Sequence, residues 1–78
     1  MTDYGIVLFH TSSSAMQAEA VLARAALPAK LIPTPRQLSS DCGVALRFDW
    51  AHNDQVSALL SQSRVETAGI HRLPGSPR

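Results

Sequence analysis

The stretch "AKLIPTPRQLSSDCGVALRFDW" (29–50) decides the fold, because it contains two strand patterns joined by a short polar loop. Residues 44–50 alternate large apolar side chains with Ala, Arg and Asp, which is typical of a half-buried strand. Residues 29–35 predict a second strand, but their two prolines lack a backbone donor and therefore place it at a sheet edge. The polar residues 36–43 between the strands predict a hairpin connection.

One helix pattern lies on each side of this hairpin. The Ala-rich segment 15–27 is strongly helical, follows a cluster of N-cap residues at 11–14, and is expected to end at Pro28. Segment 52–64 predicts the second helix, with Asn53 as its N-cap. The hairpin is therefore bracketed by two helices that are available to cover one face of a sheet.

Two outer strand patterns complete the chain. Residues 4–10 are apolar on both faces, which is typical of a central strand, and residues 66–73 predict a weaker last strand. The resulting order β-α-β-β-α-β indicates a ferredoxin-like α+β sandwich, a four-stranded antiparallel sheet with two helices on one face. Its first and third strands would be central. We expect a single domain over residues 1–78, with a core at 3–73 and a flexible tail at 74–78.

The composition limits the possible function classes. The chain has 78 residues, a net charge of +1 and only 17% charged residues. No basic stripe with interleaved aromatics, no signal peptide and no long apolar run is present, so we expect neither nucleic acid nor a membrane as partner, and a cytoplasmic location. The spacing of His and Cys shows no metal motif, and we expect no metal or other cofactor. The low content of charged residues and a first strand that is apolar on both faces suggest that the open sheet face exposes apolar side chains. We therefore expect a homo-oligomer.

The strand directions place the polar loop 36–43 at the same end of the sheet as the helix start at 11–14. This loop holds Cys42, the single cysteine of the chain. A helix N-terminus carries partial positive charge and would lower the pKa of a nearby thiol, and Arg36 would act in the same direction. Asp41 would oppose them, because a neighbouring carboxylate disfavours a second negative charge. From these residues alone, Cys42 is either a reactive thiol or a small buried apolar residue.

Other polar or small residues near this end also allow two interpretations each. His10 is either a base or thiolate partner, or an exposed histidine at a strand end. Gly43 either forms the hairpin turn or lets a partner approach the backbone closely. The serines 12–14 either cap the helix or form an anion site, and Glu19 favours the N-terminal half of the helix electrostatically.

The segment 18–48 resembles the selenium/sulfur carrier protein-like family of small bacterial and archaeal proteins. The family pattern combines a Glu in an Ala-rich helix, a Pro-Arg segment, a Ser-rich turn with Cys-Gly, and a strand with Leu-Arg-Phe. The corresponding positions here are Glu19, "IPTPR" (32–36), "SSDCG" (39–43) and "LRF" (46–48). The resemblance covers most of the chain and weakens after Trp50.

This resemblance implies a carrier rather than an enzyme with a complete catalytic site. Cys42 would accept sulfur or selenium as a persulfide or selenopersulfide and pass it to a partner, so the implied partners are donor and acceptor proteins. The absence of a second cysteine argues against an intramolecular dithiol cycle. The residues expected to support the thiol are Arg36, Ser39, Ser40, Gly43, His10 and Glu19.

A second function class stays open. Ferredoxin-like domains can also be protein-interaction or metabolite-sensing modules, because a fold does not determine a function. In that case the sheet face opposite the helices would bind the partner and Cys42 would be incidental. Rapid alkylation of Cys42 in the native protein would favour the carrier, whereas reaction only after unfolding would favour the module.

Overall fold

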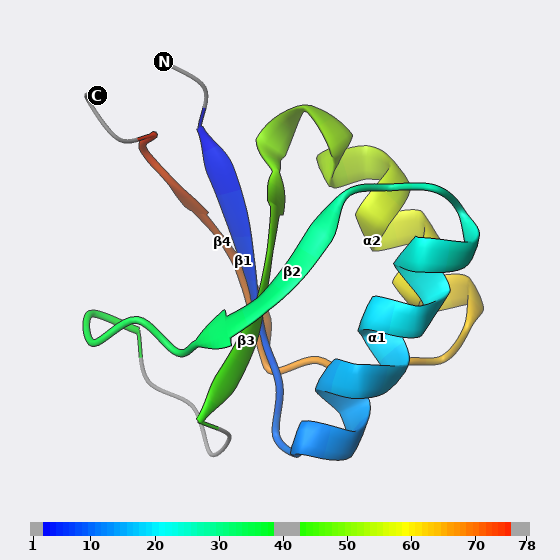
Figure 1. Cartoon of the computed structure of the whole chain (residues 1–78), viewed down its shortest axis with the longest axis horizontal. Helices are drawn as coiled ribbons and strands as arrows, with labels where there is room; N and C mark the ends of the chain where they lie inside the picture. The colour runs from blue at the N-terminus through cyan, green and yellow to red at the C-terminus, as the bar shows by residue number, and fades with distance from the viewer. Residues whose placement is uncertain (1–2, 39–42, 76–78) are drawn as a thin grey trace.

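The computed structural model describes residues 3–38 and 43–75 and has the predicted ferredoxin-like order of elements. These elements are β1 (Tyr4–Leu8), α1 (Ser12–Arg24), β2 (Ala29–Pro33), β3 (Val44–Asp49), the short 3₁₀ helix η1 (Trp50–His52), α2 (Asn53–Gln62) and β4 (Gly69–Leu73). All neighbouring strands are antiparallel, in the order β2-β3-β1-β4, so β1 and β3 are central as predicted and the proline-bearing β2 is an edge. Figure 1 shows both helices on the same face of this sheet.

The strands are shorter than their sequence patterns. The pattern at 4–10 yields a strand that ends at Leu8, and the pattern at 66–73 yields one that begins at Gly69. These two residues are direct partners in the β1–β4 register, so both strands end where their shared pairing ends. Apolar alternation continues beyond this point because Phe9 is buried in the core although it is outside the strand.

The core consists of two clusters, one on each face of the sheet. The larger cluster lies between the sheet and the helices, and its buried members are Val7, Phe9, Ala15, Ala18, Leu22, Leu46, Phe48, Val56, Leu60 and Val65. The smaller cluster is on the open face, where Ile6, Leu8 and Ala45 are buried although no helix covers them. Side chains of the chain itself pack against this cluster: Tyr4, Ile32, Leu38 and Leu73.

This coverage removes the reason that we gave for self-association. The open face was expected to expose apolar side chains, but Ile6 and Leu8 are 0% and 3% exposed. Among the described residues, the exposed large apolar side chain is Met16, on the helix side of the chain. Self-association therefore stays a prediction without an exposed sheet face to support it. Within the described part of the chain, none of the helices has the length and apolarity needed to cross a membrane.

Helix α1 begins and ends earlier than expected. Its N-cap is Thr11, whose side-chain oxygen accepts a hydrogen bond from the Ser14 N–H at 3.2 Å, so the serines 12–14 form the first turn. At the other end, Ala26 has a φ of 59° and the Leu27 N–H donates to the Leu22 carbonyl at 3.0 Å. This is a Schellman ending, which reverses the chain before Pro28 is reached.

Helix α2 corrects the prediction that Asn53 is an N-cap. The Asp49 side chain accepts a hydrogen bond from the Ala51 N–H at 3.0 Å and so begins η1, which leads directly into α2. Asn53 is therefore the first residue of α2, and its N-cap His52 makes no side-chain capping bond. The helix ends like α1, in a Schellman motif with Arg64 at a φ of 56°.

Candidate functional site

The sheet register brings the predicted site segments to one end of the molecule. Leu8 pairs with Ala45, and Pro33 pairs with Val44, so the end of β1, the end of β2 and the start of β3 lie together. Helix α1 starts at this end, directly after His10 and Thr11, as Figure 1 shows. The prediction that the cysteine loop and the start of α1 share one end is therefore confirmed for the residues that flank the loop.

The base of the cysteine loop, the polar loop 36–43 that holds Cys42, is closed by a backbone hydrogen bond. The Thr34 N–H donates to the Gly43 carbonyl at 3.0 Å, directly beyond the last β2–β3 pair. Cys42, Ser39 and Ser40 lie outside the described residues, so their predicted positions and roles stay predictions. The hydrogen bond nevertheless determines where both ends of their segment leave the sheet.

The first half of the loop folds toward the open sheet face. Residues 35–38 form a turn in which the Leu38 N–H donates to the Pro35 carbonyl at 3.0 Å. The turn lies on the side of the sheet away from α1 (Figure 1), and the Leu38 side chain packs on the open-face cluster. Arg36 is exposed in this turn. The sequence did not reveal this anchoring, because nothing in a polar loop indicates which sheet face a single Leu covers.

Gly43 lies directly before β3 and has open space where a side chain would be. A Cβ at this position would meet no atom within 4 Å. The residue is exposed. The hairpin turn itself falls on residues 39–42, outside the described ranges, so both uses expected for Gly43 stay predictions.

His10 and Glu19 are both exposed, but only His10 lies at the end of the sheet from which the cysteine loop leaves. His10 lies between β1 and α1, at the end of the sheet that carries the loop. Glu19 is about two turns into α1, because the helix begins at Ser12 rather than at residue 15. The helix dipole acts mainly on the first turn, so it does not explain this glutamate.

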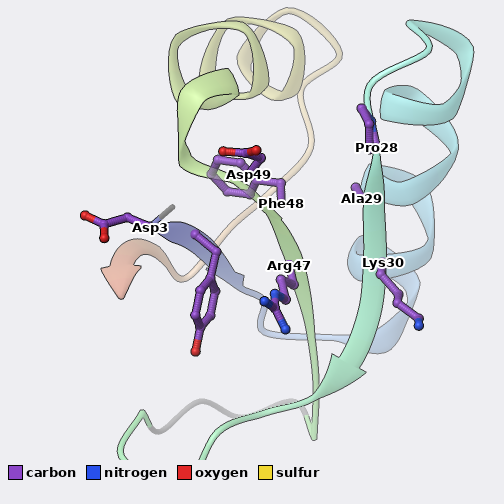
Figure 2. Close-up of a pocket in the computed structure, with 8 residues that line it drawn as sticks. Asp3, Pro28, Ala29, Lys30, Arg47, Phe48 and Asp49 are labelled. Atoms are coloured by element: carbon purple, nitrogen blue, oxygen red, sulfur yellow. The ribbon is translucent and has the colours of Figure 1, made fainter. Parts of the chain in front are cut away.

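A cavity of about 430 Å³ lies at the opposite end of the sheet and was not predicted from the sequence. It is formed where β1 and β2 begin and β3 ends, and Pro28 and Ala29 contribute apolar lining. The Arg47 guanidinium lies over the Tyr4 ring, 4.1 Å from the ring centroid, as a cation–π contact. Figure 2 shows these side chains around the cavity.

The sequence contained part of the signal for this cavity. The alternation of residues 44–50 separates Arg47 from the core-facing residues and therefore assigns it to the other sheet face. Its neighbours follow only from the strand register, which pairs Arg47 with Lys30 on one side and with Ile6 on the other. Within the described residues, no cluster of three or more His, Cys, Asp or Glu side chains could hold a metal ion.

Comparison with known proteins identifies a family. A model of the family described as "Putative Se/S carrier protein-like" matches residues 4–72 of the chain. This range includes both flanks of the loop and Cys42 itself. No curated protein and no solved structure matches the chain.

Proposed function

Since the chain belongs to the Se/S carrier protein-like family, we propose that it carries a sulfur or selenium atom on Cys42 and delivers it to a partner protein. The observation that carries this proposal is the extent of the family match, which spans residues 4–72 and contains the single cysteine of the chain. A carrier needs one accessible thiol, and this chain has no second cysteine with which to form an internal disulfide.

The loading step is a transfer between two sulfur atoms. The Cys42 thiolate attacks the outer sulfur of a persulfide on the donor protein, and the bond between the two donor sulfurs breaks. The donor cysteine leaves as a thiolate, and Cys42 becomes the persulfide. No external oxidant is required, because the sulfur is transferred at its existing oxidation level. In delivery, a thiolate of the acceptor attacks the outer sulfur of the Cys42 persulfide, and Cys42 leaves as a thiolate. Selenium would be transferred in the same way.

The described flanks of the loop support such a role. The bond between Thr34 and Gly43 and the packing of Leu38 attach the described flanks of the loop to one end of the sheet. Arg36 is exposed in the same loop, and a nearby guanidinium favours the thiolate form of cysteine. Gly43 beside Cys42 leaves its side-chain space empty, which suits the close approach of a donor or acceptor.

A second candidate function, the binding of a small ligand, is favoured by the cavity at the other end of the sheet. That cavity has an apolar lining and two exposed cations, as a metabolite-binding module would need. The two functions use different ends of the sheet and do not exclude each other.

Persulfide loading tests the carrier proposal. The protein is incubated with a cysteine desulfurase and cysteine, and intact-mass spectrometry measures addition of one sulfur atom that a reductant removes. We expect loading of the native protein and none of Cys42→Ser. In the control Ser40→Cys/Cys42→Ser the thiol is moved by two positions, and we expect much weaker loading. A native protein that reacts readily with an alkylating reagent but never accepts sulfur would contradict the proposal.

A further inference from the structure

Two cations face each other across the edge of the sheet without an evident structural reason. Lys30 of β2 is the direct register partner of Arg47 of β3, and both side chains are exposed on the open face. Like charges directly opposite each other destabilise a pair of strands. Among the described residues, neither cation forms an ion pair with a carboxylate. The stability of the fold therefore does not account for this pair.

Both cations border the cavity of about 430 Å³ at the end of the sheet, a volume within the usual range of small-molecule sites. Arg47 is held by its contact with the Tyr4 ring, and this contact limits the directions in which its N–H groups can point. Pro28, Ala29 and Tyr4 provide apolar surface for the same cavity, whereas Phe48 is only 2% exposed and lies in the helix-side core. The site thus combines positive charge with a surface for a compact apolar group.

The two carboxylates of the cavity are already engaged elsewhere. Asp3 accepts a hydrogen bond from Arg72 Nε at 2.7 Å, and Asp49 accepts one from the Ala51 N–H at 3.0 Å. In Figure 2 neither carboxylate points toward the Arg47 guanidinium, and Lys30 extends outward from β2. Because the Asp3 charge is paired with Arg72, the charges left in the lining are those of Lys30, Arg47 and Asp49, and their balance is positive.

We propose that this cavity binds a small organic phosphate, a phosphate monoester whose ester group is a ring or a similarly compact apolar body. A phosphate monoester carries nearly two negative charges at neutral pH and so matches the two cations. The guanidinium of Arg47 can donate two parallel hydrogen bonds to its oxygens, and the flexible Lys30 can turn toward the same group. The ester group would contact the apolar lining. This inference goes beyond sulfur transport, because the cysteine loop lies at the other end of the sheet.

Three matched probes test the chemistry of the site. The protein is titrated with phenyl phosphate, inorganic phosphate and benzoate, and binding is followed by the backbone amide signals in NMR spectra. We expect saturable binding of phenyl phosphate with shifts at Tyr4, Lys30 and Arg47. Inorganic phosphate lacks the ring and benzoate lacks the second charge, so each should bind about tenfold more weakly, the equivalent of one lost favourable contact. Equal affinity for all three would refute the combined site, and no saturable binding of phenyl phosphate would refute any site.

Variants locate the binding and separate it from the carrier function. Arg47→Gln and Lys30→Gln should each weaken phenyl phosphate binding about tenfold, because each removes a charged hydrogen-bond donor. Arg24→Gln, which removes an equal charge from the end of α1, should leave it unchanged. Cys42→Ser should also bind normally, so failure of the carrier proposal would not affect this result. Normal binding by both folded cavity variants would overturn the proposal.

Discussion

The ring of Phe48 occupies the space directly over Gly5 on the neighbouring strand, where any side chain of residue 5 would have to lie. The two residues are register partners in the central β1–β3 pair, and Phe48 belongs to the core cluster beneath the helices. Glycine usually weakens a strand, but here an aromatic ring covers it and fills the missing volume. The glycine at position 5 is therefore a packing requirement.

Replacing Gly5 by Ala should destabilise the protein. The added methyl group would overlap the Phe48 ring, and the ring is too well packed in the core to move freely. Overpacking of this kind costs about 1–3 kcal/mol of unfolding free energy, which urea denaturation measures. Gly43→Ala is the matched control, since its methyl group would meet no atom within 4 Å. If Gly5→Ala and Gly43→Ala had the same free energy of unfolding, the Phe48 ring would not require a glycine at position 5.

Replacing Ala26 by Gly should stabilise the protein. Ala26 adopts a φ of 59° in the Schellman ending of α1, a conformation that strains residues with a Cβ. Glycine relieves the strain but loses more backbone entropy on folding, so we expect a net gain of about 0.5–1 kcal/mol. Ala20→Gly, at an exposed position inside the same helix, should instead cost about 1 kcal/mol. Thermal unfolding of both variants would show shifts of opposite sign, and a loss of stability in both would rule out the strain.

Lys30→Gln should raise stability in the absence of ligand, because it removes the repulsion between Lys30 and Arg47. The expected gain is about 0.2–1 kcal/mol at low ionic strength, and added salt should reduce it by screening the charges. Urea denaturation at two salt concentrations measures both effects. A gain that is independent of salt would show that the change acts through strand propensity rather than through charge.

The sequence predicted most of the fold because the relevant signals are local. The alternation of residues 44–50 and the prolines at 33 and 35 are sufficient to place a half-buried central strand next to an edge strand. The helix ends were less predictable. Residues 11–14 are all competent N-caps, and the Schellman turn at Ala26 uses an alanine where glycine is the usual signal.

The two candidate sites differ in how far they could be predicted from the sequence, because they depend on long-range strand pairing to different degrees. Chain direction alone was enough to bring the cysteine loop and the start of α1 to the same end of the sheet. The anchoring of Leu38 and the meeting of Lys30 with Arg47 depend on the strand register and on packing across the sheet. Each of these two contacts joins residues that are far apart in the sequence. The periodicity within a single segment therefore does not predict either contact.

Arg36→Gln should slow the reaction of Cys42 with iodoacetamide at neutral pH. The thiolate is the reacting form, and the exposed guanidinium in the same loop favours it. Because solvent screens this interaction, we expect only about a two- to threefold decrease in rate. Arg24→Gln removes the same charge from the end of α1 and should react at the native rate. If the two variants react equally, Arg36 has no role at the thiol.

Cys42→Ser separates a carrier thiol from a structural one. Its neighbours Gly43 and Leu38 attach the loop to the sheet by a backbone hydrogen bond and by apolar packing, and neither contact needs the Cys42 side chain. We therefore expect the free energy of unfolding to change by no more than about 0.5 kcal/mol, as for most surface substitutions. The native thiol should react with iodoacetamide at least as fast in buffer as in urea. A buried cysteine would behave in the opposite way: serine would place an unsatisfied hydroxyl in an apolar site at a cost of about 1–3 kcal/mol, and the thiol would react only after unfolding. That result would remove the basis of the carrier proposal and leave the small-ligand cavity as the functional site of the chain.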